Sequence, residues 1–289
     1  MLDLRIGRVS PGQDFASFSC DFQNLTFCGS QPGNVRGEYW FNWPVSQWGA
    51  RIKYAPDERM YLQLGAYQVN PRYADDAWAR DNELYPNNPF GTTGAPIPLE
   101  AGFQPAWHGR PGSYKFGAWY DTSNAADAYL DKNHRPLPLT GDAALQHDST
   151  YGFYVNLQQQ ITGAADERGA TVFFNFTQSD RDTAVSMDRQ LALGIHYKDP
   201  LGAGTDDAAG AAFGINHVSK PVADRQHLHA LLTGSTPHAR QRIRGGVFYG
   251  WKPRPCLTLR PNLQFIRHPG GVETARNVTV IGLKTTIEF

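Results

Sequence analysis

The sequence predicts an all-β protein whose antiparallel strands form a transmembrane β-barrel. About twelve segments alternate apolar and polar residues with a period of two, which is the side-chain period of a strand with one apolar and one wet face. Short turns alternate with longer polar connections between these segments, as in outer-membrane barrels. The apolar sets often end in Tyr, Trp or Phe, which suits the aromatic girdles at the two membrane interfaces.

The expected strands run along the whole chain. Each is close to the ~9–11 residues that a tilted strand needs to cross a bilayer. In the last of them Ile281, Leu283 and Ile287 lie on one face, and Gly282 and Lys284 lie on the other. The expected strands are 2–6, 48–54, 60–67, 99–107, 114–121, 151–158, 171–177, 191–198, 208–216, 243–252, 257–265 and 279–289.

The connections between these strands are alternately short and long. A soluble β-sandwich is the alternative fold, but it leaves unexplained the arginines and lysines that recur in mid-strand on the non-apolar faces. The short connections lie near Ala55, His108, Gly163, Pro200 and Pro253, and the longer ones near Ser10, Asn70, Asp121, Ser179 and Ser219.

The overall charge limits the class of partner. The 289 residues include 27 basic and 27 acidic side chains, so the formal net charge is zero. Surfaces that bind nucleic acid usually carry a basic excess, so this balance argues against a nucleic-acid partner. No apolar run approaches the roughly 20 residues of a membrane-spanning helix, and barrel strands need none because half of each strand faces water.

Two stretches carry a resemblance to a known family. The run TLRPNLQFIRHPGG from Thr258 to Gly271 precedes a last strand that ends on Phe289. The run RIGRVSPGQDF begins at Arg5, and the Cys-containing run CDFQNLTFCG begins at Cys20. Together these runs resemble the OprB-type carbohydrate-selective porins.

The resemblance implies a single porin domain over residues 1–289, embedded in the outer membrane of a Gram-negative bacterium. Phe289 would then be the terminal aromatic that the barrel assembly machinery reads. Members of the family have 16-stranded barrels, and no signal peptide precedes the strand that begins at Met1. We therefore expect an N-terminally truncated member that lacks about four strands.

The resemblance also implies a function, which is the passive, selective diffusion of small sugars such as glucose, without cofactor or covalent chemistry. The lipid of the outer membrane would be the other partner, and the family allows monomers or a homotrimer. A general, weakly selective porin is the alternative, and an outer-membrane enzyme or a glycan-binding β-protein is a more distant one.

Enzyme motifs are missing from the sequence. There is no Gly-x-Ser-x-Gly elbow, no phosphate-binding Gly-x-x-x-x-Gly-Lys and no His-Glu-x-x-His. The one close His pair, His227 and His229, falls in the expected polar loop 219–239 without an evident third ligand. We therefore expect neither catalytic residues nor a metal site.

The polar strand faces supply candidates for the solute path. A pore for uncharged sugars needs groups that hydrogen-bond hydroxyls, and flat rings that cover the apolar face of a pyranose. Arg8 shares parity with the apolar residues of its strand, so we expect it at the rim or at the start of the following loop. The candidates are Arg5, Arg8, Arg51, Lys53, Tyr61, Glu100, Trp119, Arg242, Arg244 and Arg260.

The cysteines indicate an oxidising compartment. Cys20 and Cys28 enclose seven residues of a polar, turn-rich stretch, a feasible spacing for a disulfide. A metal pair is the less favoured alternative, because no His or third Cys lies nearby. We expect the disulfide to hold the shape of a loop at the pore mouth, and Cys256 to be a free thiol.

Overall fold

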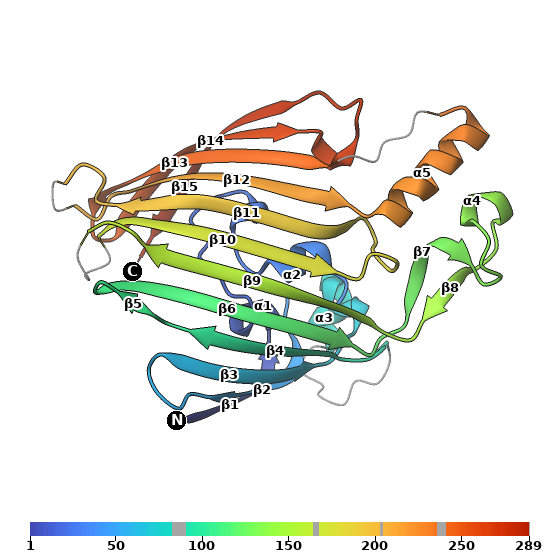
Figure 1. Cartoon of the computed structure of the whole chain (residues 1–289), viewed down its shortest axis with the longest axis horizontal. Coiled ribbons are helices and arrows are strands. Elements are labelled where there is room, and N and C mark those ends of the chain that lie inside the picture. The colour runs from blue at the N-terminus through green and yellow to red at the C-terminus, as the bar shows by residue number, and fades with distance from the viewer. Residues whose placement is uncertain (83–90, 164–167, 203–204, 236–240, 289) are drawn as a thin grey trace.

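The structure, a computed structural model, describes residues 1–82, 91–163, 168–202, 205–235 and 241–288. One large antiparallel sheet dominates it (Figure 1). Its strands are β1 (Leu2–Val9), β2 (Gln47–Tyr54), β3 (Met60–Tyr67), β4 (Pro96–Phe103), β6 (Arg110–Asp121), β9 (Thr150–Gln160), β10 (Gly169–Ser179), β11 (Met187–Lys198), β12 (Ala208–Val218), β13 (Arg242–Arg254), β14 (Leu257–Arg267) and β15 (Val278–Ile287).

Each strand of this main sheet pairs with the next one along the path, so the order in space follows the order in sequence. A short strand, β5 (Ala106–Trp107), pairs with β6 at its start. Every strand expected from the alternation lies on a strand of the main sheet, which confirms the all-β prediction. The expected strand over 99–107 is too long, because β4 ends at Phe103.

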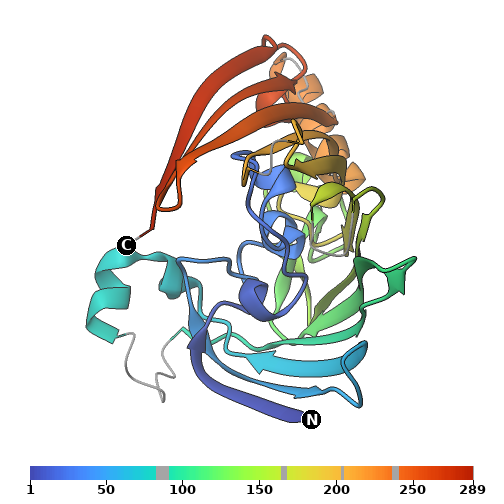
Figure 2. The same cartoon turned by 90° about the vertical axis from the view of Figure 1, so that its left-hand side faces the viewer.

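The main sheet curves strongly around a hollow (Figure 2). Its edge strands are β1, whose only sheet neighbour is β2, and β15, whose only sheet neighbour is β14, within the residues that the structure describes. No helix in the described ranges is long and apolar enough to cross a membrane.

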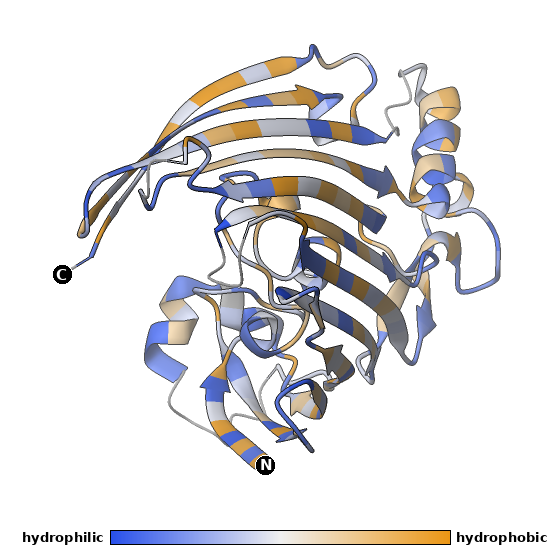
Figure 3. Cartoon of the chain, turned by 60° about the vertical axis from the view of Figure 1, so that its left-hand side comes forward, coloured by the Kyte–Doolittle hydropathy of each residue, from blue (hydrophilic) through white to orange (hydrophobic). Residues whose placement is uncertain are grey.

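The two faces of the main sheet differ as the alternation predicts. On β11, Gln190 and Ala192 are fully buried on the concave face, whereas Leu193 is 43% exposed on the convex face. Ile281 on β15 is 86% exposed. Figure 3 shows the resulting bands of polar and apolar residues along the strands. The convex face therefore presents a continuous apolar surface, as a lipid-facing wall would.

The two ends of the sheet differ in the length of their connections (Figure 1). Tight turns join β2 to β3 and β13 to β14 at one end, here called the short-turn end. The long connections gather at the other end, the long-loop end. They contain η2 (Pro71–Ala74), α3 (Asp76–Asn82), the two-stranded sheet of β7 (Ala125–Asp131) and β8 (Ala144–His147), α4 (Leu137–Thr140), α5 (Lys220–Thr233) and η3 (Pro269–Gly271).

Two parts of the long-loop end differ from the sequence-based expectation. Residues 220–233 form helix α5 instead of a polar loop, with a Pro in the first turn and Gly234 as a left-handed C-cap. Its buried residues, Val222 and Ala230, are too few to give a clear apolar stripe, so the helical period was not visible. The β7–β8 hairpin was not anticipated either.

The connection from β1 to β2, residues 10–46, turns into the hollow of the main sheet (Figure 2). We call it the inward loop. It contains α1 (Pro11–Asp14), η1 (Leu25–Phe27) and α2 (Gln31–Val35). Phe15 and Trp40 of the loop are fully buried with Tyr67, Trp119 and Tyr154 of the sheet in one aromatic cluster. A second cluster joins Phe22 and Phe27 to Phe173, Ala192 and Phe248.

The core of the molecule therefore lies between the inward loop and the concave face of the main sheet. We call this concave face the inner wall. Burial of each large aromatic side chain stabilises this contact by roughly 1.5–3 kcal/mol.

Candidate functional site

Glu100, on β4, joins the inner wall to the inward loop through four hydrogen bonds. The side chain is fully buried. Its Oε1 accepts from the Tyr61 hydroxyl at 2.7 Å and from Gln63 Nε2 at 2.8 Å. Its Oε2 accepts from the Tyr154 hydroxyl and from the backbone N–H of Ala16, both at 2.7 Å. Four donors offset the burial of a carboxylate, so this group ties three strands to the loop.

A charged network anchors the start of the inward loop. The Asp14 carboxylate lies 2.9 Å from the Arg5 guanidinium and 3.6 Å from that of Arg51. Arg51 also donates to Asp3 at 2.9 Å. The Tyr67 hydroxyl donates to the other Asp14 oxygen at 3.2 Å. Arg51 and Asp14 are both largely buried, which strengthens their attraction relative to a surface pair.

Cationic side chains from four further strands bind the middle of the loop. Each donates to an oxygen of the loop, and such charge-assisted hydrogen bonds are stronger than neutral ones. The pairs are Lys115 Nζ to the Ser17 carbonyl at 2.6 Å, Lys284 Nζ to the Cys20 carbonyl at 2.7 Å, Arg260 to the Asp21 carbonyl at 3.0 Å, and Arg244 to the Thr26 hydroxyl at 2.6 Å.

Cys20 and Cys28 form a disulfide within the inward loop, as the sequence predicts. The contact of Lys284 with the Cys20 carbonyl places this bond against β15, inside the hollow. The expected position at the pore mouth is therefore wrong. Cys256 is exposed in the turn between β13 and β14 and is a free thiol, as expected.

Seven of the ten candidate solute-path residues bond directly to the inward loop. Arg8, which shares the apolar parity of β1, donates to the Ser46 carbonyl at 2.8 Å and lies over the Tyr73 ring. Trp119 donates from Nε1 to the Tyr39 hydroxyl at 2.9 Å. The seven are Arg5, Arg8, Arg51, Glu100, Trp119, Arg244 and Arg260.

The other three candidates contact the inner wall or the rim. Lys53 lies 4.0 Å from the centre of the Tyr61 ring, in a cation–π contact. Arg242 donates to the Gly270 carbonyl at 2.7 Å, in the connection before β15. The two-residue alternation thus predicts the face of the strand on which each of these side chains lies. It does not reveal the loop residues that they bind.

Trp119 and Tyr154 are covered by the inward loop. Trp119 is 3% exposed and Tyr154 is 1% exposed. Their rings stack on one another with centroids 6.4 Å apart, and Trp40 lies 5.4 Å from Trp119. With the loop in this position, neither ring presents an open face to a solute.

Tyr39 closes this aromatic cluster toward the long-loop end. Burial raises its pKa to about 12, although the nearby Arg36 acts in the opposite direction. Its oxygen accepts hydrogen bonds from Trp119 and from the Thr150 hydroxyl, the latter at 3.1 Å. The hydroxyl therefore stays protonated at any physiological pH.

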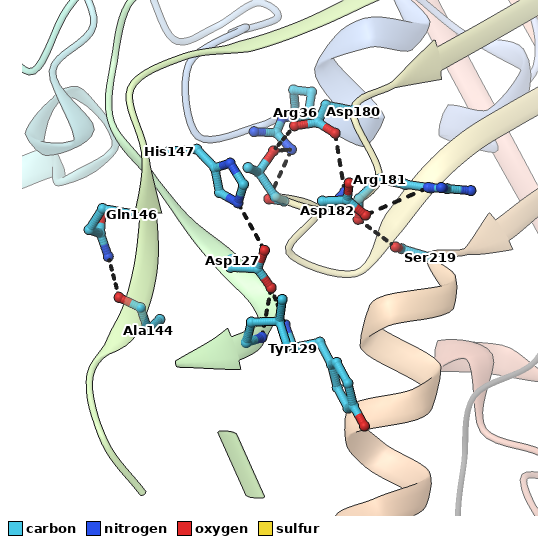
Figure 4. A network of polar contacts seen from close by, with 12 residues as sticks. Arg36, Asp127, Tyr129, Ala144, Gln146, His147, Asp180, Arg181, Asp182 and Ser219 are labelled. Carbon is cyan, nitrogen blue, oxygen red and sulfur yellow. Dashed lines mark hydrogen bonds and ion pairs between the residues drawn. The ribbon is translucent and has the colours of Figure 1, made fainter. Parts of the chain in front are cut away.

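Polar contacts hold the β7–β8 hairpin together at the long-loop end (Figure 4), and the Ala128 N–H joins it to the β10–β11 connection by donating to the Asp182 carbonyl at 2.7 Å. The Asp127 carboxylate lies 2.8 Å from His147 Nε2 and accepts from the Tyr129 backbone N–H at 2.8 Å. Burial alone would raise the pKa of Asp127, but these hydrogen bonds outweigh it and hold the pKa below its usual value. Arg36 of the inward loop donates to the Thr183 carbonyl at 3.1 Å.

The family comparison covers the whole chain. Residues 1–289 match the family described as "Carbohydrate-selective porin, OprB family". The chain is 39% identical over 307 residues to Porin B of Pseudomonas aeruginosa, and the match covers 100% of this chain and 65% of that protein. It is 34% identical over 308 residues to a putative porin, QuiX, of Acinetobacter baylyi, and covers 66% of that protein.

A solved structure gives the same result. The high-pH structure of Pseudomonas putida OprB is 39% identical in sequence and superposes with a TM-score of 0.94. The match covers 100% of this chain and 70% of that one. The chain thus spans 65% and 66% of the lengths of the two curated relatives. The alternating strands, the inward loop and these matches show that the chain belongs to the OprB family of carbohydrate-selective porins.

Proposed function

We propose that this protein is a porin of the Gram-negative outer membrane through which small sugars such as glucose diffuse passively. The inward loop carries the proposal, because it is bonded to a polar inner wall inside a sheet whose convex face is apolar. In this function the protein is a channel and needs no cofactor, metal or covalent intermediate. Residues 1–289 contribute to one barrel domain.

The apolar convex face suits the lipid of the outer membrane as its surroundings. The barrel assembly machinery is the proposed partner for insertion, with Phe289 as the signal; this residue lies outside the described part of the chain. A homotrimer is compatible with this role.

The charges of the inner wall favour neutral solutes. Strong rings of a single sign select ions, whereas the wall here carries both signs in contact, as between Asp3 and Arg51. The inward loop narrows the hollow, so a solute meets side chains that hydrogen-bond hydroxyl groups. A sugar presents many such groups and no charge.

A general, weakly selective porin is the second candidate. One observation favours it, which is that Glu100 and Trp119 are buried by the inward loop and are closed to solutes in this state. Selectivity would then rest on pore size alone.

Liposome swelling with the complete protein separates these two functions. We expect glucose to enter faster than an amino acid of similar size, because the amino acid carries two charges. Equal rates for the two solutes would favour the general porin, and chemical turnover of the sugar would overturn both.

Arginine variants test which part of the wall the sugar passes. Arg51→Ala and Arg244→Ala should change the ratio of glucose to amino-acid flux while the barrel still assembles, because neither substitution exposes a charge to lipid. Arg59→Ala, in the exposed turn between β2 and β3, is the matched control. An unchanged ratio in both wall variants would place the path elsewhere.

A further inference from the structure

A cavity of about 540 Å³ lies between the inward loop and the inner wall, toward the short-turn end. Its floor is formed by neighbouring strands from β6 to β12. Its roof is formed by Ser19 and Asp21 of the inward loop. None of the ten candidate solute-path residues lines it.

Strand register brings polar side chains together on the floor. Ser113 on β6 lies opposite Gln158 on β9, and Gln158 lies opposite Phe173 on β10. In the next row toward the short-turn end, Thr171 lies opposite His196 on β11. Because side chains two residues apart share a face, these two rows form one patch of hydroxyl, amide and imidazole groups beside an aromatic ring.

Two glycines leave room for the aromatic rings of this patch. A Cβ at Gly194 would lie 2.6 Å from the Phe173 ring, and one at Gly210 would lie 2.4 Å from the Phe248 ring. Both rings can therefore lie flat against the wall, where Phe22 of the inward loop packs on them, and only Phe173 borders the cavity.

The polar groups on the floor are not used by the fold. The Ser113 and Thr171 hydroxyls and the Gln158 amide make no hydrogen bond to the part of the chain that the structure describes. His196 Nε2 is buried without a hydrogen bond among the described residues, and lies 3.4 Å from the Asp21 carboxylate. The Ser113, Gln158 and Thr171 side chains are half-buried, so their polar groups are accessible to a solute in the cavity, whereas the buried His196 Nε2 lacks the hydrogen-bond partner that such a group normally has.

The roof is held rigidly. Arg260 binds the Asp21 carbonyl at 3.0 Å and lies 3.3 Å from its carboxylate. Lys284 binds the preceding carbonyl, and the Cys20–Cys28 disulfide closes the segment. A site that is ordered before the ligand arrives loses less entropy on binding.

We propose that this cavity binds a neutral monosaccharide during its passage, as a holding site on the short-turn side of the inward loop. The inference rests on the proposed porin function and gives it a defined site. Hydroxyls and amides both donate and accept, as vicinal sugar hydroxyls require, and Phe173, which is 5% exposed, closes the cavity on its long-loop side. The formal charges at the site balance, because Asp21 is paired with Arg260 and the lining also contains Lys198 and Asp206, so the site has no net charge that would favour an ionic ligand over a neutral one. The volume lies within the roughly 300–1,000 Å³ of small-molecule sites.

The test uses shape-conserving variants of the complete protein in planar bilayers. Glucose is titrated while the ionic current is recorded, and the concentration that gives half of the maximal current reduction is measured. Gln158→Met and Thr171→Val each remove one hydrogen-bonding group and should raise this concentration about fivefold. Thr258→Val is the matched control, since Thr258 lies on the inner wall of β14 near the same end but outside the cavity.

The outcomes distinguish a failure of the proposed function from a failure of the proposed site. If glucose does not enter liposomes through the unaltered protein, the proposed function and the site both fail. If glucose enters but has no saturable effect on the current of the unaltered protein, the site alone fails. If it saturates but Gln158→Met and Thr171→Val leave the half-maximal concentration unchanged, or Thr258→Val shifts it equally, the site alone fails. Heat-modifiable mobility checks that each variant assembles, and Ser113→Ala replaces any variant that does not.

Discussion

Replacing Glu100 by glutamine should loosen the inward loop while leaving the size of the side chain unchanged. An amide offers one acceptor oxygen where the carboxylate offers two. If that oxygen keeps the hydrogen bonds from Ala16 and Tyr154, the amide nitrogen faces the donors of Tyr61 and Gln63. The Tyr61 hydroxyl can rotate to accept, but the Gln63 amide loses its hydrogen bond to residue 100 and keeps only the one to the Asp14 carbonyl.

The size of this effect follows from the bonds that are lost or weakened. Hydrogen bonds to a charged group contribute about 1.5–3 kcal/mol and neutral ones about 0.5–1.5 kcal/mol, so a net loss of about 2 kcal/mol is expected in the local stability of the loop. This corresponds to roughly a thirtyfold increase in the population with the loop undocked.

Hydrogen exchange of the Ala16 amide reports this opening directly, since that N–H donates to Glu100. We expect its exchange in Glu100→Gln to be faster by about the same thirtyfold factor, while the amides of β10 and β11 keep their protection. Glu58→Gln makes the same chemical change at an exposed turn residue and should have no effect. An unchanged exchange rate at Ala16 would show that Glu100 does not hold the loop.

Three further predictions concern other parts of the chain. Cys20→Ser should lower the free energy of unfolding by roughly 2–3 kcal/mol in the chain-entropy model, measured by chemical denaturation; mass spectrometry that finds Cys20 and Cys28 both free in the native protein would contradict the disulfide. Leu193→Arg places a charge on the convex face and should destabilise the protein in a bilayer by about 2–4 kcal/mol, whereas normal assembly and stability would argue against a lipid-facing β11. Because the pKa of Asp127 is lowered, its ionised carboxylate stabilises the β7–β8 hairpin above the usual carboxyl pKa, and this stabilisation is lost as the pH falls through the lowered value. The hairpin amides of the unaltered protein should therefore lose protection from hydrogen exchange in acid, and this acid-dependent loss should be absent in Asp127→Asn. The same pH profile in both proteins would contradict this role of Asp127.

The strands could be predicted because their signal is local. A two-residue period shows in any short window, and all the strands of the main path from β1 to β15 followed from it. The faces followed too, since Glu100 and Trp119 point inward as their parity requires. The aromatic residues at the ends of the strands and the short turns between them predicted where the two ends of the sheet lie.

The packing of the inward loop could not be predicted, because its contacts join residues far apart in the sequence. The Ala16–Glu100 hydrogen bond spans 84 positions and the Lys284–Cys20 bond spans 264. No periodicity encodes such a pairing. The same limit hid the cavity above Gln158 and Thr171, since only the register of several strands brings those side chains together.

The inward loop also sets an order of events in folding. Its residues are made soon after β1, yet they bind Arg244 on β13, Arg260 on β14 and Lys284 on β15. Contacts of such high contact order form slowly, since the intervening chain must be brought together first. The loop therefore completes its docking only after the last strand of the sheet has arrived. A chain stalled before β10 would hold an undocked loop with Phe22 and Phe27 exposed, because Phe173, Ala192 and Phe248, which bury them, lie on β10, β11 and β13; such exposure marks the chain for aggregation or degradation.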